Sequence, residues 1–126
     1  IPPLPVGRTV LLVEDDDGVR ASVGDMLATL GCKVRAVESG AAALVWLQQQ
    51  PQQPDLVLLD HTMPGMLGTE FIRRLRGLGF ATPIVLATGD ARIDPPPVQN
   101  LELLRKPYEP AQLQGAALRA MGAMGA

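Results

Sequence analysis

The feature that most constrains the fold is a regular alternation of short apolar runs with segments of helical spacing. The five apolar runs are residues 9–13, 32–37, 55–59, 83–88 and 101–106. After the first run, apolar residues recur every three or four positions, at Val19, Val23, Met26, Leu27 and Leu30. Strands that alternate with helices favour a parallel sheet covered by helices on both faces. The sequence therefore predicts a doubly wound α/β domain.

The composition of each run indicates its place in the sheet. The first, third and fourth runs are continuously apolar, as expected for strands buried on both faces. The second carries Lys33 and Arg35 and the fifth carries Glu102 and Arg105, which is typical of edge strands. These patterns predict a flavodoxin-like strand order of 2-1-3-4-5. In that order, ligands bind at the carboxyl ends of strands one and three.

Capping residues and apolar spacing predict the helix boundaries. The first helix ends at Gly31, and the second occupies residues 40–50. The expected starting residues of the later helices are Ser39, Thr69 and the Glu109-Pro110 pair. The expected inward positions of the last two helices are Phe71, Ile72, Leu75, Leu78, Leu113, Ala117, Met121 and Met124.

The segment between the fourth and fifth runs lacks a helical pattern. It spans residues 89–100 and contains Pro95, Pro96 and Pro97. Each interior proline costs a helix about 3 kcal/mol and disfavours a helical residue before it. We therefore expect a degenerate fourth helix, with at most a turn or two.

Composition excludes several classes of protein. A chain of 126 residues with 47% apolar residues suits one domain with one core. The net charge is −2 without a basic run, which argues against nucleic-acid binding, and no apolar stretch approaches the ~20 residues of a membrane span. Cys32 is the only cysteine, which fits a reducing compartment such as the cytoplasm.

The first eight residues differ from the rest of the chain. They contain three prolines and read as an extended linker, so we expect a linker over residues 1–8 and the domain over residues 9–126. Because the chain does not begin with Met, we also expect it to be part of a longer protein.

Five chemically active side chains follow the predicted strands. Glu14 and Asp15 follow the first strand, Asp60 the third, Thr88 the fourth and Lys106 the fifth. Parallel strands end at one edge of a sheet, so these groups should meet there. A few carboxylates at one site suit Mg²⁺, and a carboxylate nucleophile can form an aspartyl-phosphate. Lys106 and Thr88 would then hold phosphoryl oxygens.

Four segments carry a resemblance to a known family. They are "VLLVEDD", "PDLVLLDHTMPGMLG", "PIVLATG" and "LLRKPYEP". In this order they resemble the receiver domain of two-component response regulators. The resemblance implies a phosphoacceptor that takes its phosphoryl group from a histidine kinase or a histidine phosphotransfer domain.

The resemblance also implies a role for each site residue. Asp60 corresponds to the phosphoacceptor, Thr88 to the switch hydroxyl and Lys106 to the ion-pairing lysine. The implied Mg²⁺ ligands are Asp15 directly, Glu14 largely through metal-bound water, Asp60, and the backbone carbonyl of Thr62.

Two departures from the family pattern bear on how the domain passes on its signal. Leu103 stands where the family often has an aromatic residue, and the helix after the fourth strand is degenerate. Both belong to the face that such domains use for activation-linked dimers. We therefore expect a monomer that acts within a hybrid histidine kinase or a relay. We expect no enzymatic activity of the domain beyond its own phosphorylation and dephosphorylation.

Two alternatives stay open on sequence grounds. Asp15, Asp16, Asp17 and Gly18 match the nucleophile motif of haloacid-dehalogenase-like phosphatases, which would use Asp15 and Asp17. A flavodoxin-like nucleotide binder is less compatible, because four acids after the first strand would repel phosphate.

Other conspicuous residues are expected to be structural. Asp16 and Asp17 should lie near the start of the first helix, where acids favour the helix dipole. His61 is expected to be a partly exposed loop residue. Cys32, Trp46 and Tyr108 are expected to pack against the fold.

Overall fold

The computed structural model describes residues 3–122, which form a five-stranded parallel sheet in the order β2-β1-β3-β4-β5. The strands are β1 (Thr9–Val13), β2 (Lys33–Val37), β3 (Leu56–Asp60), β4 (Ile84–Thr88) and β5 (Leu101–Arg105). The helices are α1 (Asp17–Thr29), α2 (Gly40–Gln49), α3 (Gly68–Gly77) and α4 (Pro110–Ala120). The predicted fold class and strand order are confirmed, and every strand lies within one residue of its expected limits.

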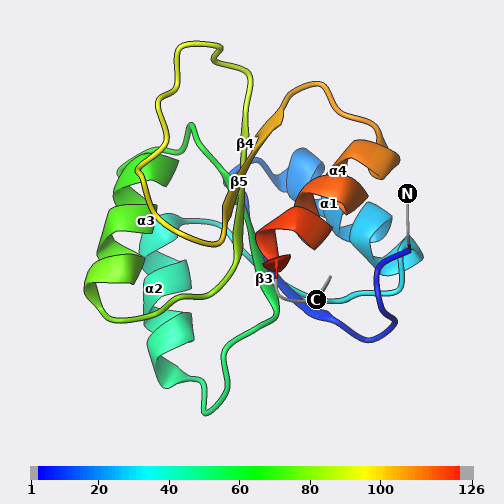
Figure 1. Ribbon diagram of the computed structural model, residues 1–126, viewed down its shortest axis with the longest axis horizontal. Helices are drawn as coiled ribbons and strands as arrows, with labels where there is room; N and C mark the ends of the chain where they lie inside the picture. Colours follow the sequence, from blue (N-terminus) through cyan, green and yellow to red (C-terminus); the bar gives the residue numbers. More distant parts are fainter. Residues whose placement is uncertain (1–2, 123–126) are drawn as a thin grey trace.

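Helices cover both faces of the sheet (Figure 1). Leu12 and Leu58 pack with α1 and α4 on one face, whereas Leu11 and Leu59 pack with α2 and α3 on the other. Successive residues of a strand point to opposite faces, so a continuously apolar strand contributes to both cores. This explains why β1, β3 and β4 read as unbroken apolar runs.

Local sequence sets most of the helix starts. Asp16 caps α1 by accepting a hydrogen bond from the Val19 backbone N–H at 2.9 Å, and Ser39 caps α2 by accepting one from Ala42 at 3.0 Å. At α4, Glu109 and Gln112 form a capping box around Pro110. The expected positions of Asp16, Ser39 and Glu109 are therefore confirmed.

The start of α3 differs from the prediction. The helix begins at Gly68 after an N-cap residue, Leu67, that makes no side-chain cap, so Thr69 is not the cap. The Gly68 backbone N–H donates to the His61 carbonyl oxygen at 2.8 Å. This tertiary hydrogen bond satisfies a helix-end donor that a capping side chain would otherwise satisfy.

Two expected core positions are exposed. Val19 is 41% exposed in the first turn of α1, and Leu78 is 49% exposed because α3 ends at Gly77. Leu113, Ala117 and Met121 are buried as expected. The predicted inward position of Met124 lies outside the described residues.

The segment between β4 and β5 contains turns and bends but no helix over residues 89–100, as expected from its prolines. Ile93 and Val98 pack against the core on the α3 side of the sheet. Arg76 of α3 holds the end of the segment by donating to the Gln99 carbonyl oxygen at 3.0 Å. The segment thus lies against the domain without forming a helix.

Leu4 and Gly7, which precede β1, contact the rest of the domain. Leu4 is buried in the core beside α1 and α4, and the Gly7 backbone N–H donates to the Gly31 carbonyl oxygen at 2.8 Å. The boundary proposed at residue 8 stays a prediction. Among the described residues, no helix is long and apolar enough to span a membrane.

Candidate functional site

The three acids singled out in the sequence meet at the carboxyl edge of the sheet. Glu14 and Asp15 follow β1, and Asp60 ends the neighbouring strand β3, with Val13 opposite Leu59 in the ladder. One carboxylate oxygen from each of the three residues lies within 4.8 Å of the others. Strand order alone brings these residues together, since Asp60 is far from Glu14 in sequence.

The environments of these acids differ. Glu14 is 6% exposed, whereas Asp15 is exposed and Asp60 is partly buried. Burial raises the pKa of Glu14, and the negative charge of Asp60 raises it further, although a hydrogen bond from the Asp16 backbone N–H opposes the shift. A divalent cation would relieve this crowding, so the donor set fits Mg²⁺.

Two basic side chains partly balance the acids. The Lys106 ammonium donates to Asp60 Oδ1, forming an ion pair. Arg20 of α1 donates to the carbonyl oxygen of Glu14 at 3.0 Å and so fixes the acidic loop. The sequence prediction included Lys106 but missed Arg20. In the sequence, the only indication of this role for Arg20 was its position about one turn into the helix that follows the acids.

Thr88 lies at the end of β4, beside Lys106. The Lys106 backbone N–H donates to the Thr88 carbonyl oxygen at 2.9 Å, and the Thr88 side chain is buried. The Thr88 hydroxyl oxygen accepts a hydrogen bond from the Asp90 backbone N–H at 3.0 Å. Because that bond uses a lone pair, the hydroxyl proton can still be donated to another acceptor.

The loop after β3 contains Thr62 and His61. Thr62 is exposed two residues after Asp60. His61 is only 6% exposed, and its buried Nδ1 atom has no hydrogen-bond partner among the described residues. The expectation of a partly exposed His61 is therefore wrong. Its backbone continues the sheet by donating to the Ala87 carbonyl oxygen, which carries the side chain inward.

The hollow at this site is small. Glu14, Asp60, Lys106 and Tyr108 line a space of about 20 Å³ together with apolar side chains of β1, α1, β3 and β4. Such a volume holds little more than one water molecule, whereas organic ligands occupy pockets of roughly 300–1,000 Å³. This hollow is too small for a nucleotide, and it does not include Asp15, Thr62 or Thr88.

Tyr108 packs against the core on the α1 and α4 side, as expected. Burial raises the pKa of its phenol, and the charges of Glu14 and Asp60 raise it further. Tyr108 therefore stays neutral beside the acids.

Asp17 does not join the acidic site. Its side chain is 92% exposed and forms an ion pair with Arg20 in the first turn of α1. A phosphatase of the haloacid-dehalogenase type would need Asp17 beside Asp15 at the reacting centre. This geometry therefore gives that alternative no support.

The close approach of Gly68 to the site predicts a large effect of substitution. An added Cβ would lie 2.6 Å from Leu86 Cδ1 and 2.9 Å from the Cα atom of His61. Gly68→Ala should lower the free energy of unfolding by about 1–3 kcal/mol, because the backbone beside Asp60 must shift. Chemical denaturation measures this change.

Gly77→Ala is the matched control. Gly77 also lies in α3, and its added Cβ would meet no atom within 4 Å. We expect this variant to be neutral or more stable by up to about 1 kcal/mol, since alanine favours helix. Equal stabilities of the Gly68 and Gly77 variants would show that the close approach at Gly68 is unimportant.

The raised pKa of Glu14 predicts a pH-dependent stability without metal. The folded-state pKa lies above the ordinary value of 4.5, so the folded protein holds the Glu14 proton more strongly than the unfolded chain does. The ionised carboxylate therefore costs stability, and this cost grows as pH rises from about 4.5 through the folded-state pKa. Glu14→Gln should raise the melting temperature in chelator at pH 7.

The advantage of the Glu14→Gln variant should disappear as pH falls well below 4.5, where Glu14 is protonated in both states. Thermal unfolding across this range measures the difference. A constant advantage at every pH would contradict an electrostatic cause.

Comparison with known proteins agrees with this arrangement. The family model described as "Response regulator receiver domain" matches residues 10–117. The transcriptional regulatory protein AfsQ1 of Streptomyces coelicolor is 36% identical over 112 residues, covering 89% of this chain and 48% of that protein. The phosphate regulon transcriptional regulatory protein PhoB of Pseudomonas aeruginosa is 32% identical over 115 residues, covering 86% and 49%. The chain thus spans about half the length of these relatives.

Solved structures share the fold. A response regulator receiver domain protein from Clostridium thermocellum superposes with a TM-score of 0.81 at 20% identity, covering 94% of this chain and 97% of that chain. The receiver domain of the sensor histidine kinase PA1611 from Pseudomonas aeruginosa, described with a magnesium ion coordinated in its active-site cleft, has a TM-score of 0.78 at 27% identity. That comparison covers 93% of this chain and 99% of that chain. With the family model matching most of its length, the chain belongs to the response regulator receiver domain family.

Proposed function

We propose that Asp60 accepts a phosphoryl group from a phosphohistidine of a histidine kinase or a histidine phosphotransfer domain. An Asp60 carboxylate oxygen attacks phosphorus, the phosphorus–nitrogen bond breaks, and the imidazole leaves as the new phosphorus–oxygen bond forms. The observation that carries this proposal is the convergence of Glu14, Asp15 and Asp60 with the Lys106 ammonium.

Two side chains would orient the transferred group. The Lys106 ammonium pairs with Asp60 and would transfer part of this interaction to a phosphoryl oxygen. Thr88 would donate its hydroxyl proton to another oxygen, in keeping with the lone pair already engaged by Asp90. These contacts would place a positive charge and a hydrogen-bond donor beside the phosphoryl oxygens, where negative charge develops during the transfer.

The acids would hold Mg²⁺ through the carboxylates of Glu14, Asp15 and Asp60 and the backbone carbonyl of Thr62. When bound, Mg²⁺ supplies positive charge that offsets the carboxylates and the phosphoryl oxygens. Support comes from the spacing of the three carboxylates and from the magnesium ion described for the receiver domain of PA1611.

The direct test is to locate the phosphoryl group. The protein would be incubated with acetyl phosphate and Mg²⁺, and the acyl phosphate reduced with borohydride before peptide mapping. We expect the reduced residue at position 60. A modification that maps only to Asp15 would instead favour the phosphatase alternative.

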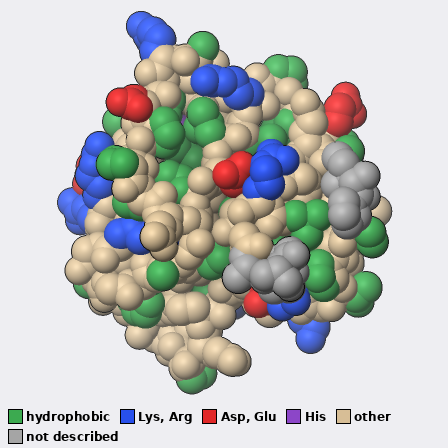
Figure 2. All heavy atoms as spheres, in the orientation of Figure 1, with side chains coloured by type: hydrophobic (Ala, Val, Ile, Leu, Met, Phe, Trp, Pro, Cys, Tyr) green, Lys and Arg blue, Asp and Glu red, His purple; other side chains and the backbone are tan. Residues whose placement is uncertain are grey.

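We further propose that the output does not use an activation-linked dimer. Residues 89–100 form no helix, and Leu103 of β5 packs partly buried against the core. The domain would pass or withhold its phosphoryl group within a hybrid histidine kinase or a relay in the cytoplasm, with residues 1–8 as a linker to the domain over residues 9–126. The domain itself would contact neither membrane nor nucleic acid; in Figure 2, Lys and Arg side chains are scattered over the visible face.

The output proposal predicts a monomer in both signalling states. Sedimentation would be measured with Mg²⁺, with and without beryllofluoride, which mimics the phosphoryl group on a carboxylate. We expect one monomeric species in each case. A beryllofluoride-dependent dimer that is disrupted by substitutions at Glu102 or Arg119, which pair across β5 and α4, would overturn this reading.

A further inference from the structure

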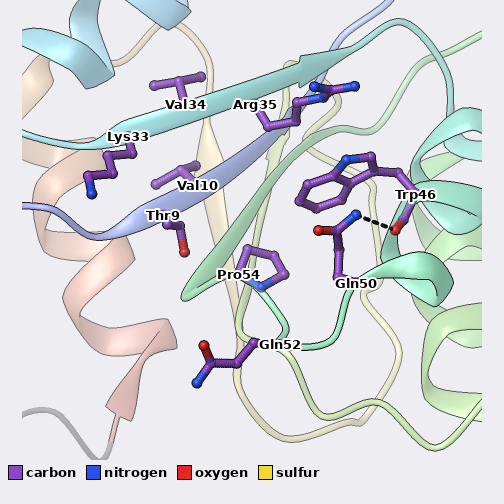
Figure 3. A pocket seen from close by; sticks show the side chains of 9 residues that line it. All are labelled: Thr9, Val10, Lys33, Val34, Arg35, Trp46, Gln50, Gln52 and Pro54. Atoms are coloured by element: carbon purple, nitrogen blue, oxygen red, sulfur yellow. Dashed lines mark hydrogen bonds between the residues drawn. The ribbon is translucent and has the colours of Figure 1, made fainter.

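A second hollow lies on the α2 side of the sheet, at the β2 edge. We call it the β2-edge hollow; it has a volume of about 260 Å³. The lining side chains used below are Thr9 of β1, Lys33 and Arg35 of β2, Trp46 of α2, and Gln50 and Pro54 after that helix. Figure 3 shows these side chains arranged around the open space.

The hollow results from incomplete cover of the sheet. Thr9, Lys33 and Arg35 share the face of the sheet that carries α2, because Thr9 pairs with Lys33 and Leu11 with Arg35 in the ladder. The helix ends at Gln49, and the chain then leaves toward Pro54. With β2 at the sheet edge, the start of the β1–β2 pair stays open to solvent on this side.

Apolar surface and positive charge meet in the hollow. Trp46 and Pro54 supply apolar walls, and the Arg35 guanidinium lies 5.8 Å from the centroid of the Trp46 ring. Gln50 is held beside Trp46 by donating to its carbonyl oxygen at 3.2 Å.

The charge of the lining is one-sided. Lys33 and Arg35 are exposed, and neither pairs with an acid among residues 3–122. No residue lining the hollow is acidic. The nearby Asp55 carboxylate accepts a hydrogen bond from Thr9 Oγ1 at 3.1 Å and is paired with Arg8 at 3.5 Å. The hollow therefore combines apolar walls with two positive charges, those of Lys33 and Arg35, that no described acid neutralises.

We propose that the β2-edge hollow binds an acidic peptide segment of a partner protein. One apolar side chain of the segment would enter the hollow between Trp46 and Pro54, and flanking carboxylates would pair with Lys33 and Arg35. The volume fits one large side chain and is smaller than the roughly 300–1,000 Å³ of typical small-molecule sites. The unpaired edge of β2 leaves room for the rest of the segment.

This site is separate from the acidic site. Thr9 begins β1, whereas Glu14 and Asp15 follow its other end. A segment in the β2-edge hollow would leave Asp60 accessible to its phosphoryl donor. The proposal therefore does not depend on the phosphoryl-transfer function, and Asp60→Asn should bind the same peptides with unchanged affinity.

Trp46 provides a built-in probe, because it is the only tryptophan of the chain. Short acetylated peptides of Asp and Glu with one central Leu, Phe or Ala would be titrated into the whole protein while Trp46 emission is recorded. We expect saturable binding of the Leu and Phe peptides, and binding of the Ala peptide about tenfold weaker. Peptides with Lys in place of the acids should not bind.

Charge-removing variants distinguish binding in the β2-edge hollow from non-specific attraction of acidic peptides to the protein. Lys33→Gln and Arg35→Gln should each weaken binding about twofold to fivefold, and more steeply at low salt. Arg73→Gln is the matched control: it removes one exposed positive charge from α3 that pairs with no described acid and does not line the hollow. It should leave the affinity unchanged, and thermal unfolding should confirm that all three variants are folded.

Three outcomes would overturn the proposal. The first is the absence of saturable binding by any acidic peptide, measured by both fluorescence and calorimetry. The second is an equal loss of affinity in the Arg35→Gln and Arg73→Gln proteins, which would indicate non-specific attraction. The third is binding of free phenylacetate as tight as that of the Phe peptide, which would indicate a small-molecule site.

Discussion

Replacing Asp60 with asparagine should abolish phosphoryl uptake. In the parent protein with acetyl phosphate and Mg²⁺, intact-mass measurement should show one added phosphoryl group. Asp60→Asn removes the nucleophilic carboxylate but keeps the size of the side chain, so no uptake is expected within the same time. The loss should be complete, because Asp60 is the only carboxylate among residues 3–122 that pairs with Lys106.

Asp17→Asn provides the control for this experiment. Asp17 lies three residues from Glu14 but is 92% exposed and pairs with Arg20, outside the acidic cluster. Its substitution should leave the added mass unchanged. A phosphoryl group retained on the Asp60→Asn protein would place the acceptor elsewhere and refute the assignment of Asp60.

Mg²⁺ should stabilise the fold, and Asp15 should carry much of this effect. A ligand that binds only the folded state at ten times its Kd adds about 1.4 kcal/mol to the free energy of unfolding. For a domain of this size, the melting temperature should rise by about 4–8 °C. Removing the Asp15 carboxylate takes one of three acids from the cluster, so the rise should largely vanish in Asp15→Asn.

Calorimetric titration of Mg²⁺ into the parent, Asp15→Asn and Asp17→Asn proteins would test the same point by affinity. The Asp17→Asn protein should retain the parent response to Mg²⁺. Equal Mg²⁺ responses in the parent and Asp15→Asn proteins would argue against a metal site built on Asp15.

The strand order of the sheet could be predicted from local patterns, because the residue types of a strand reflect how deeply it is buried. Unbroken apolar runs require burial on both faces, which placed β1, β3 and β4 centrally, and polar residues placed β2 and β5 at the edges. Once that order is known, Glu14, Asp15 and Asp60 must converge, since parallel strands end at one edge. Proline chemistry likewise predicted the missing helix at residues 89–100.

Some features were decided only by contacts between distant segments. The burial of His61 and the start of α3 depend on the approach of Gly68 to the β3 backbone and to Leu86 of β4.

The β2-edge hollow is also a tertiary feature. In the sequence, nothing distinguishes Lys33, Arg35 and Trp46 from ordinary surface or packing residues. The space between them exists because α2 leaves part of the sheet uncovered. Sequence periodicity reports which face of an element is buried, but not how completely another element covers it. The sequence thus determined the fold and the placement of the acids, whereas packing between elements decided the burial of His61, the start of α3 and the second site.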